Sequence, residues 1–341
     1  MSAVGADRSF AATAVGLDTR AQVVAELRAA EKLVLVTHEN PDGDALGSLV
    51  GMHRILLALG KDSVMFMAAD EFPLPYEYRS IEFDGLASVP PPDLAERTIV
   101  FLDCGNIDRN PADAFKRENA HILNIDHHHD NTRFGTVNLV DGDASCTAEI
   151  VWELMRALGV EPTIEIAEAL YIGLVTDTGK FMYENTGVRA HVMAAELIEA
   201  GVDVHGIFRR LYEGMPFPKL ELLGRALAQL RRIDDDALTF AYLSRDDFRL
   251  AGAEESYSEG IIDHLRSVEG TKVAALAREL VDGGGAGRKK VSLRAADGTV
   301  DVSAIARAGG GGGHRQAAGF ATSLSHEELV AFLRGQVAAQ L

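Results

Sequence analysis

The sequence predicts an α/β protein in which an N-terminal, doubly wound parallel sheet is followed by a smaller α+β domain. Short apolar runs alternate with helical patterns through the first part of the chain, which is typical of a parallel sheet. The chain has 341 residues, more than one hydrophobic core comfortably supports, so two domains are expected. The later part of the chain has strands around a glycine-rich hairpin or loop, which indicates a second, differently organised domain.

The first domain is expected over residues 18–210. It opens with a helix over residues 18–30, because Val23, Val24 and Leu27 share one face. The first strand is Leu33–Thr37, and its helix runs from about Ala45 to Leu59, where Gly60 ends it. The remaining elements are strands at Ser63–Met67, Thr98–Leu102 and His121–Ile125, and helices at Thr147–Leu158, Thr163–Val175 and 188–200.

A loop with several prolines is expected at Phe208–Pro218, and a linker over residues 211–225 leads into the second domain, residues 226–341. That domain is predicted to be α+β. Its expected elements are strands at Leu238–Leu243, Val273–Leu280 and Lys290–Arg294, helices at Tyr257–Val268, Val302–Ala306 and about Ser325–Leu341, a loop at Gly283–Gly287 and an apolar return at Ala317–Thr322.

Charge and cysteine content narrow the classes of function. Lys plus Arg number 33 and Asp plus Glu number 51, which gives a net charge of −18. A protein that binds long nucleic acid through its phosphates needs a basic face, which is the opposite of this charge balance. A phosphate-bearing substrate must therefore be small, or be held by metal ions and a few local cationic side chains. The two cysteines, Cys104 and Cys146, are too few for a disulfide framework and fit a reducing cytoplasm. No membrane-spanning or signal segment is expected.

The stretch Val34–Gly47 places polar side chains where a strand ends and a helix begins. His38 ends the strand, and Asp42 and Asp44 lie in the turn that follows. A parallel sheet presents its ligand-binding crevice at the carboxyl ends of its strands. These three side chains are therefore predicted to share one metal site, although Asp-Gly-Asp by itself is ordinary turn chemistry.

Other segments add ligands of the same kinds. Asp103 follows the strand Thr98–Leu102, His127 follows His121–Ile125, and Asp177 ends a helical pattern. Four carboxylates and two imidazoles match the needs of two divalent cations, and the nitrogen ligands favour manganese, cobalt or zinc over magnesium alone. Because six side chains must serve two ions, some carboxylates are expected to bridge. The candidate metal ligands are His38, Asp42, Asp44, Asp103, His127 and Asp177.

These motifs resemble those of a known superfamily. HENPDGD from His38, Asp103, Asp126-His127-His128 and GLVTDTGKF at 173–181 resemble the four motifs of the DHH phosphoesterases. GGGGGHRQAAG at 309–319 resembles the signature of their C-terminal DHHA1 domain. The size and motif order are most similar to the nanoRNase and pAp phosphatase group, which includes bacterial cyclic-di-AMP and pApA phosphodiesterases.

The resemblance implies roles for individual residues. One ion would be held by His38, Asp42 and Asp103, and the second by Asp44, Asp103, His127 and Asp177. His128 would face the substrate, and Asp126 would orient the histidines. The implied cofactor is a pair of divalent ions, Mn²⁺ first, with Mg²⁺ or Co²⁺ as alternatives. His129 exceeds the motif, and its role stays open.

The glycine run Gly309–Gly313 predicts a second binding element. Glycines let the backbone approach a phosphate closely and expose main-chain N–H groups. Arginine binds phosphate bidentately or stacks on a base. The resemblance implies nucleotide binding here, with the active site in the cleft between the domains. The candidate substrate-binding residues are Arg294, Gly311, Gly312, Gly313, His314 and Arg315.

The function expected from these features is metal-dependent hydrolysis of very short oligoribonucleotides to mononucleotides and of pAp to AMP and phosphate. Dinucleotides such as pApA and cyclic di-AMP are further candidate substrates, long duplex nucleic acid is not, and the resemblance implies a homodimer. No G-x-S-x-G elbow or phosphate-binding G-x-x-x-x-G-K-[ST] loop occurs, which argues against an α/β hydrolase or a P-loop NTPase. The alternatives are a RecJ-like single-stranded DNA exonuclease and a catalytically silent nucleotide sensor.

Overall fold

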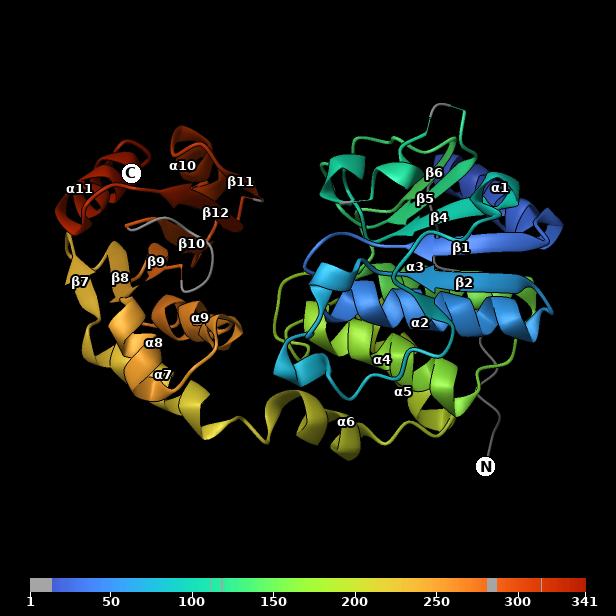
Figure 1. The fold of residues 1–341 in the computed structure, drawn as a ribbon, viewed down its shortest axis with the longest axis horizontal. Helices are drawn as coiled ribbons and strands as arrows, with labels where there is room; N and C mark the ends of the chain where they lie inside the picture. Colours follow the sequence, from blue (N-terminus) through green and yellow to red (C-terminus); the bar gives the residue numbers. More distant parts are fainter. Residues whose placement is uncertain (1–13, 111, 118, 281–286, 314) are drawn as a thin grey trace. The chain divides into compact units, whose positions relative to one another are not determined.

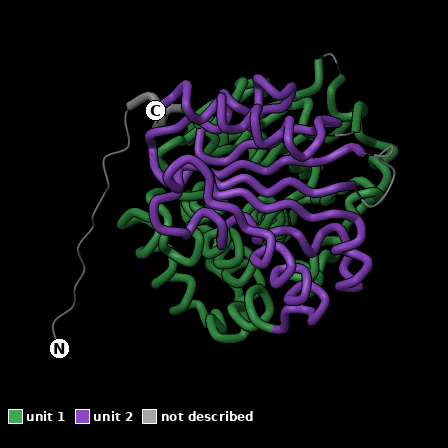
Figure 2. Tube along the Cα trace, turned by 90° about the vertical axis from the view of Figure 1, so that its left-hand side faces the viewer, with its two compact units in different colours: residues 1–213 green, residues 214–341 purple. Residues whose placement is uncertain are grey.

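The computed structural model describes residues 14–110, 112–117, 119–280, 287–313 and 315–341, with side chains from residue 19 onward. The chain forms two compact units that divide between Glu213 and Gly214. Figure 2 colours them separately, and the strands of unit 2 can be followed side by side there.

Unit 1 is built on a six-stranded parallel sheet with the order β3-β2-β1-β4-β5-β6 (Figure 1). The order reverses between β1 and β4, which are hydrogen-bonded neighbours. Parallel sheets bind ligands beyond the carboxyl ends of their strands at such a reversal. His38 and Asp103 follow these two strands. The strands are β1 (Lys32–Val36), β2 (Asp62–Phe66), β3 (Leu86–Ala87), β4 (Thr98–Leu102), β5 (Ile122–Asp126) and β6 (Val137–Val140).

The central strands of unit 1 are mostly apolar because both faces of the sheet are covered. Leu33 and Leu35 of β1 belong to the large core formed with the helices, whereas Val34 and Val36 belong to a smaller core on the other face. The helices are α1 (Ala14–Ala29), α2 (Gly43–Ala58), α3 (Thr147–Leu158), α4 (Ile164–Asp177), α5 (Val188–Glu199) and α6 (Val204–Tyr212). Five short 3-10 turns complete the unit: η1 (Ala69–Glu71), η2 (Tyr76–Tyr78), η3 (Leu94–Glu96), η4 (Ile107–Arg109) and η5 (Asp113–Phe115).

Helices α2 and α4 pack closely because glycines line their contact. A Cβ atom on Gly47 would lie 2.4 Å from the carbonyl oxygen of Ala169, and one on Gly43 would lie 2.4 Å from the Thr176 side chain. Such distances are too short for any side chain, so these positions require glycine. The close contact brings the first turn of α2, with Asp44, beside the last turn of α4, with Asp177.

Unit 2 is a mixed six-stranded sheet with the order β11-β12-β10-β9-β8-β7, in which only β8 and β9 pair in parallel. Helices α10 and α11 cover one face, and α7, α8 and α9 cover the other (Figure 1). The strands are β7 (Arg231–Ile233), β8 (Leu238–Leu243), β9 (Val273–Glu279), β10 (Lys289–Ala295), β11 (Gly312–Gly313) and β12 (Ala317–Thr322). The helices are α7 (Phe217–Ala228), α8 (Arg245–Ala251), α9 (Ile261–Arg266), α10 (Val302–Ala308) and α11 (His326–Ala338), with a 3-10 turn η6 (Glu255–Ser258).

The predicted fold class is confirmed, and the differences are local. The loop expected at residues 208–218 is wrong in most of its length, because α6 continues to Tyr212 and α7 begins at Phe217. Prolines 216 and 218 fit at the start of α7, where the missing N–H would have no partner in the helix. The helix expected at 257–268 is a 3-10 turn and the shorter α9, separated at Gly260, where φ is +81°. The loop expected at 283–287 lies mostly outside the described residues.

Seven helices and strands were not expected from the sequence. Helix α6 overlaps the expected loop and α7 the expected linker, and the other five are β3, β6, β7, β11 and α8. Four of these five are strands of two to four residues, and α8 has seven residues. Elements this short carry too few residues for a hydrophobic period to show. Among the helices of the described residues, none combines the length and the apolar composition that crossing a bilayer requires.

Candidate metal centre

The six predicted ligands gather at the carboxyl edge of the unit 1 sheet. They come from separate segments: the ends of β1, β4 and β5, the start of α2 and the end of α4. Their donor atoms form three overlapping groups, and within each group all atoms lie within 4.8 Å of one another. The groups are His38–Asp42–Asp103, Asp44–His127–Asp177 and Asp103–His127–His128. The structure therefore brings all six together, and Asp103 belongs to two of the groups.

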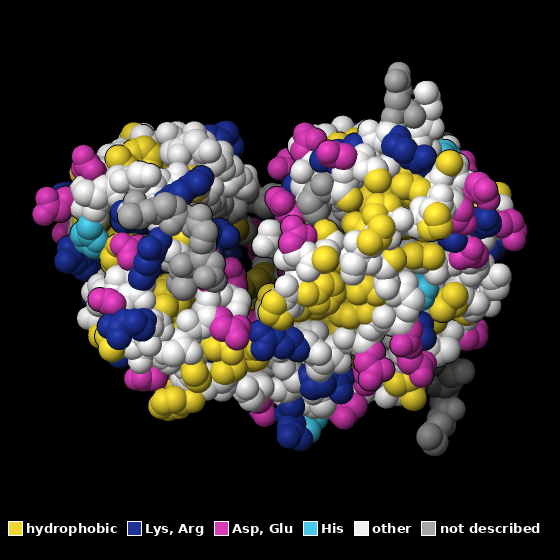
Figure 3. Space-filling model, in the orientation of Figure 1, with side chains coloured by type: hydrophobic (Ala, Val, Ile, Leu, Met, Phe, Trp, Pro, Cys, Tyr) yellow, Lys and Arg dark blue, Asp and Glu magenta, His cyan; other side chains and the backbone are white. Residues whose placement is uncertain are grey.

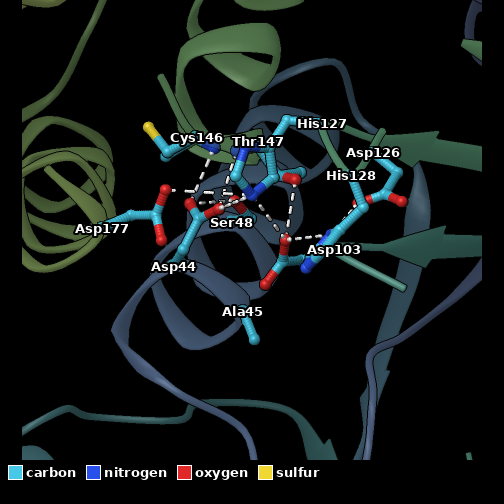
Figure 4. A network of polar contacts seen from close by, with 12 residues as sticks. Asp44, Ala45, Ser48, Asp103, Asp126, His127, His128, Cys146, Thr147 and Asp177 are labelled. Atoms are coloured by element: carbon cyan, nitrogen blue, oxygen red, sulfur yellow. Dashed lines mark hydrogen bonds and ion pairs between the residues drawn. The ribbon is translucent and has the colours of Figure 1, made fainter. Parts of the chain in front are cut away.

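Asp103 lies at the centre of this arrangement (Figure 4). Its Oδ1 accepts a hydrogen bond from Thr147 Oγ1 at 3.0 Å and lies 3.6 Å from His127 Nε2 and from His128 Nδ1. Its Oδ2 lies 3.5 Å from His38 Nε2. Burial acts to raise the pKa of Asp103, but the surrounding histidines outweigh it and hold the pKa well below its usual range. Asp103 also has φ of +57°, a strained conformation of the kind found at functional sites.

Asp44 is held by the amino terminus of α3. Its buried carboxylate accepts hydrogen bonds from the backbone N–H groups of Thr147 at 2.7 Å and Ala148 at 2.9 Å. Ser48 donates a third bond from its hydroxyl at 3.3 Å. Burial raises the pKa of Asp44 well above its usual value, and the charges of Asp103 and Asp177 raise it further. The backbone thus fixes the position of this carboxyl group although its ionised form is disfavoured.

Asp177 shows the same excess of negative charge. Burial raises its pKa to about 7, the charges of Asp42 and Asp103 act in the same direction, and His127 and His128 oppose them only in part. Asp42 caps α2, since its Oδ1 accepts from the N–H groups of Asp44 and Ala45 at 3.1 Å each. Divalent cations would relieve this repulsion, and carboxylate oxygens with imidazole nitrogens suit manganese and related ions. The donor set therefore fits two cations.

Hydrogen bonds to nearby oxygen acceptors fix the ring orientations of His38 and His128. His38 Nδ1 lies 2.7 Å from the carbonyl oxygen of Glu39, to which it donates, so that Nε2 faces Asp103. His128 Nδ1 donates to Oδ1 of the buried Asp126 at 2.7 Å. Burial lowers the pKa of His128, but the hydrogen bond to Asp126 and the charge of Asp103 outweigh it and raise the pKa to about 9.

Sequence reasoning missed two contributing residues, Thr147 and Asn131, whereas Asn185 could be noted as a residue close to the Asp177 motif. Thr147 contacts both Asp44 and Asp103, and Asn131 donates to Asp126 Oδ2 at 2.5 Å. Asn185 donates to the carbonyl oxygens of Ser145 at 2.8 Å and Asp177 at 3.1 Å, which joins the end of α4 to the segment before α3. The sequence carried no signal for Thr147, because its partners lie 44 and 103 residues away.

Two neighbouring residues stay outside the arrangement of ligands. His129 is exposed, and its ring lies against Gly142. Cys104 is buried, and burial raises the pKa of its thiol to about 12, which disfavours the thiolate form that a nucleophilic cysteine needs.

The substrate-binding residues predicted in unit 2 meet at one end of its sheet. Arg294 of β10 pairs with Ala317, and Gly312 and Gly313 form β11 beside the same strand β12. Gly311 and Gly313 must be glycine, because a Cβ on either would lie within 2.6 Å of β12 backbone atoms. Arg315 is exposed and donates to the carbonyl oxygen of Gly298 at 2.9 Å. His314 lies outside the described residues. The cleft with the metal centre stays a prediction.

The fold and the site together define a class: a phosphoesterase with an Asp–His cluster at the edge of a parallel sheet and a second domain built on a mixed sheet. The family model described as DHH family, N-terminal domain, matches residues 32–174, and that of the DHHA1 domain matches residues 240–339. The chain belongs to the DHH family, which confirms the resemblance noted in the sequence.

Relatives and solved structures agree with this membership. The chain is 36% identical over 307 residues to the bifunctional oligoribonuclease and PAP phosphatase NrnA of Thermus thermophilus, covering 87% of each chain. It is 25% identical over 296 residues to the protein of the same name from Bacillus subtilis, covering 85% of this chain and 88% of that one. An exopolyphosphatase-related protein from Bacteroides fragilis has the same fold, with a TM-score of 0.86 at 24% identity and coverage of 96% and 98%.

Proposed function

We propose that this chain is a two-metal phosphoesterase that hydrolyses very short oligoribonucleotides to mononucleotides and pAp to AMP and phosphate. The observation that carries the proposal is the convergence of six ligand-type side chains at one sheet edge. The substrates are inferred from the names of relatives that span nearly the whole chain. Linear pApA and cyclic di-AMP offer the same phosphate and adenine groups and are included as candidate substrates.

The proposed metal assignment follows the observed groups. His38, Asp42 and Asp103 would hold one ion, and Asp44, Asp103, His127 and Asp177 the other, with Asp103 shared. Mn²⁺ is the proposed ion, with Mg²⁺ or Co²⁺ as alternatives, because the ligands combine carboxylates with imidazoles. When bound, a pair of such ions lowers the pKa of water and neutralises charge on a phosphate under attack.

The chain's own residues complete the proposed site. Nδ1 of His128 donates a hydrogen bond to Asp126, which places the ring at the edge of the ligand cluster, where the family resemblance implies that it faces the substrate. Asp126 keeps that ring in one orientation, and Asn131 fixes Asp126 in turn by donating a hydrogen bond to its Oδ2. His128 is therefore the proposed substrate-contacting catalytic residue, and Asp126 its positioning residue.

Unit 2 would bind the other end of the substrate. The proposed contacts are Arg294, Gly311, Gly312, Gly313, His314 and Arg315. Small substrates are favoured over long nucleic acid by the net charge of −18. On the face of unit 1 seen in Figure 3, Lys and Arg are scattered among Asp and Glu and form no continuous basic strip.

Location and assembly are part of the proposal. The buried cysteines Cys104 and Cys146 are not joined in a disulfide, which supports the cytoplasm. A homodimer is proposed from the family resemblance, and hydrophobic side chains gathered on the visible face of unit 1 in Figure 3 are compatible with it. Analytical ultracentrifugation tests this state, and a single monomeric species at micromolar concentration would exclude it.

The test of the proposed activity is product release from pAp, pApA, cyclic di-AMP, short RNA and long single-stranded DNA, each with Mn²⁺ and with chelator. We expect turnover of the small substrates that chelator abolishes. Preference for long DNA would favour the RecJ-like alternative, and nucleotide binding without turnover would favour the sensor.

Asp103→Asn tests the shared ligand. We expect activity to fall at least about 1,000-fold, since one charge is lost from both proposed ion sites. Asp113→Asn is the matched control, because that side chain is 95% exposed in the 3-10 turn η5. Equal activity of Asp103→Asn and the wild type would refute the shared assignment.

A further inference from the structure

Arg109 is fixed beside the candidate metal centre by its backbone. It ends the 3-10 turn η4, which follows β4, and its carbonyl oxygen accepts a hydrogen bond from the N–H of Glu39 at 2.7 Å. The next residue, the buried Asn110, donates from its side chain to the carbonyl oxygen of Thr37 at 2.7 Å. Two hydrogen bonds thus join this turn to the segment on either side of His38.

The guanidinium of Arg109 faces an atom that cannot accept its hydrogen bond. Its Nη2 lies 3.1 Å from Nδ1 of His38, and within the described residues this is the one side-chain hydrogen-bond contact of the guanidinium. His38 Nδ1 also lies 2.7 Å from the carbonyl oxygen of Glu39. A carbonyl oxygen only accepts, so the shorter contact requires Nδ1 to carry the proton. Two donors then face each other, and the guanidinium lacks an acceptor.

An anion at the metal centre would supply that acceptor. Guanidinium presents several N–H donors in a rigid fork that suits the oxygens of a phosphate. The electrostatic influence of Arg109 reaches the centre, since its charge acts to lower the pKa of both His38 and His128. Arg109 therefore adds a fixed positive charge to the edge of the sheet where a phosphate would be hydrolysed.

We propose that Arg109 is a substrate-contacting catalytic residue that donates hydrogen bonds to a non-bridging oxygen of the phosphate being hydrolysed. The inference rests on the proposed function and adds a residue from this chain to it. Donors aimed at an oxygen whose charge grows in the transition state strengthen as the reaction proceeds. Arg109 remains protonated throughout, so it stabilises charge and transfers no proton.

The test compares Arg109→Gln and Arg109→Lys with the wild type in three measurements. The first is kcat/KM for pAp and pApA with Mn²⁺, the second is the affinity of the Mn²⁺-loaded protein for inorganic phosphate, and the third is Mn²⁺ affinity by calorimetry. We expect Arg109→Gln to lower kcat/KM about 100-fold, as loss of one such donor does. Phosphate affinity should fall about tenfold and Mn²⁺ affinity should stay within about twofold. Arg109→Lys should recover part of both losses, because it keeps the charge but not the fork.

The matched control is Arg54→Gln, since Arg54 lies in α2 and pairs with the exposed Asp84. It should leave all three measurements unchanged. Unchanged phosphate affinity in Arg109→Gln would overturn the proposal, and so would a parallel loss of Mn²⁺ affinity, which would mean that Arg109 acts through His38. If the wild type hydrolysed none of the substrates, the proposed function would fail, and phosphate binding would still decide the role of Arg109.

Discussion

At the level of single residues, Asp44 and Asp177 occupy positions that suit metal binding but lower the stability of the metal-free protein. Asp44 is buried and Asp177 is half-buried, both lie close to other carboxylates, and both have pKa values above the usual range. The backbone N–H groups of Thr147 and Ala148 nevertheless fix Asp44 in place. In the metal-free protein the negative charges of these carboxylates repel one another, and removing one charge should stabilise the fold.

We predict that Asp177→Asn raises the melting temperature of the protein in chelator by about 2–4 °C, which corresponds to about 1 kcal/mol for a unit of this size. The sign follows from the pKa. In the folded state the pKa of Asp177 is raised to about 7, above the value of about 3.9 in an unfolded chain, so ionisation costs stability. The gain should be full above pH 7 and vanish below pH 4, where the carboxyl group is protonated in both states.

The measurement is thermal unfolding with and without Mn²⁺. The wild type should be stabilised by Mn²⁺, and Asp177→Asn should lose most of that stabilisation while melting higher than the wild type in chelator. Asp113→Asn again serves as the control and should change neither value. A variant that melts lower than the wild type in chelator would contradict the account of repulsion at this position.

At the level of elements, the contact between α2 and α4 sets the spacing of the ligands. Gly43 and Gly47 let the two helices touch, and a Cβ on Gly173 would lie 2.9 Å from Oδ1 of Asp44. Asp44 in the first turn of α2 and Asp177 at the end of α4 are therefore positioned by small residues that carry no chemistry themselves. Any side chain in this contact would separate the helices and with them the two carboxyl groups.

We predict that Gly47→Ala destabilises the protein by about 1–3 kcal/mol, the usual cost of an added methyl group in a packed core. The new Cβ would lie 2.4 Å from the carbonyl oxygen of Ala169, a backbone atom that cannot move alone. Mn²⁺ affinity should fall as well, since the ligands of α2 and α4 move apart. Calorimetry and thermal unfolding measure the two effects.

Gly224→Ala is the matched control for this substitution. Gly224 lies in the middle of α7, and a Cβ there would meet no atom within 4 Å. Alanine should therefore leave stability equal or improve it by up to about 1 kcal/mol, because it favours the helix over glycine. Equal behaviour of the two variants would show that the α2–α4 contact tolerates a wider spacing.

Some secondary-structure elements and site residues could be predicted from the sequence, and others could not. Strands β4 and β8 and helix α3 are predicted to the residue, because their apolar patterns are long and their ends are marked. The six ligands could be predicted because each follows a strand or lies in a recognisable motif. Thr147, Asn131 and Arg109 could not, since a polar residue in a turn or first helical turn has no local signature. Their roles depend on which distant segments the sheet order brings together.

At the level of the whole molecule, the candidate chemistry is divided between two units. All six metal ligands lie in unit 1, and the glycine run with Arg294 and Arg315 lies in unit 2. We therefore expect metal binding to stabilise unit 1 and nucleotide binding to stabilise unit 2. Hydrogen exchange of the full chain separates the two contributions, because local protection reports where a ligand stabilises the structure.

We predict that Mn²⁺ alone slows exchange in unit 1, at the start of α2 and the end of α4, and leaves unit 2 unchanged. Adding AMP, a product of the proposed reaction, should then slow exchange at Gly311–Gly313 and in β10 and β12. Arg294→Gln should abolish this second protection and keep the first, whereas Arg249→Gln, in the exposed ion pair with Asp246 of α8, should alter neither. Protection by AMP that stays confined to unit 1 would mean that unit 2 does not bind the nucleotide, and the proposed division of the site would be wrong.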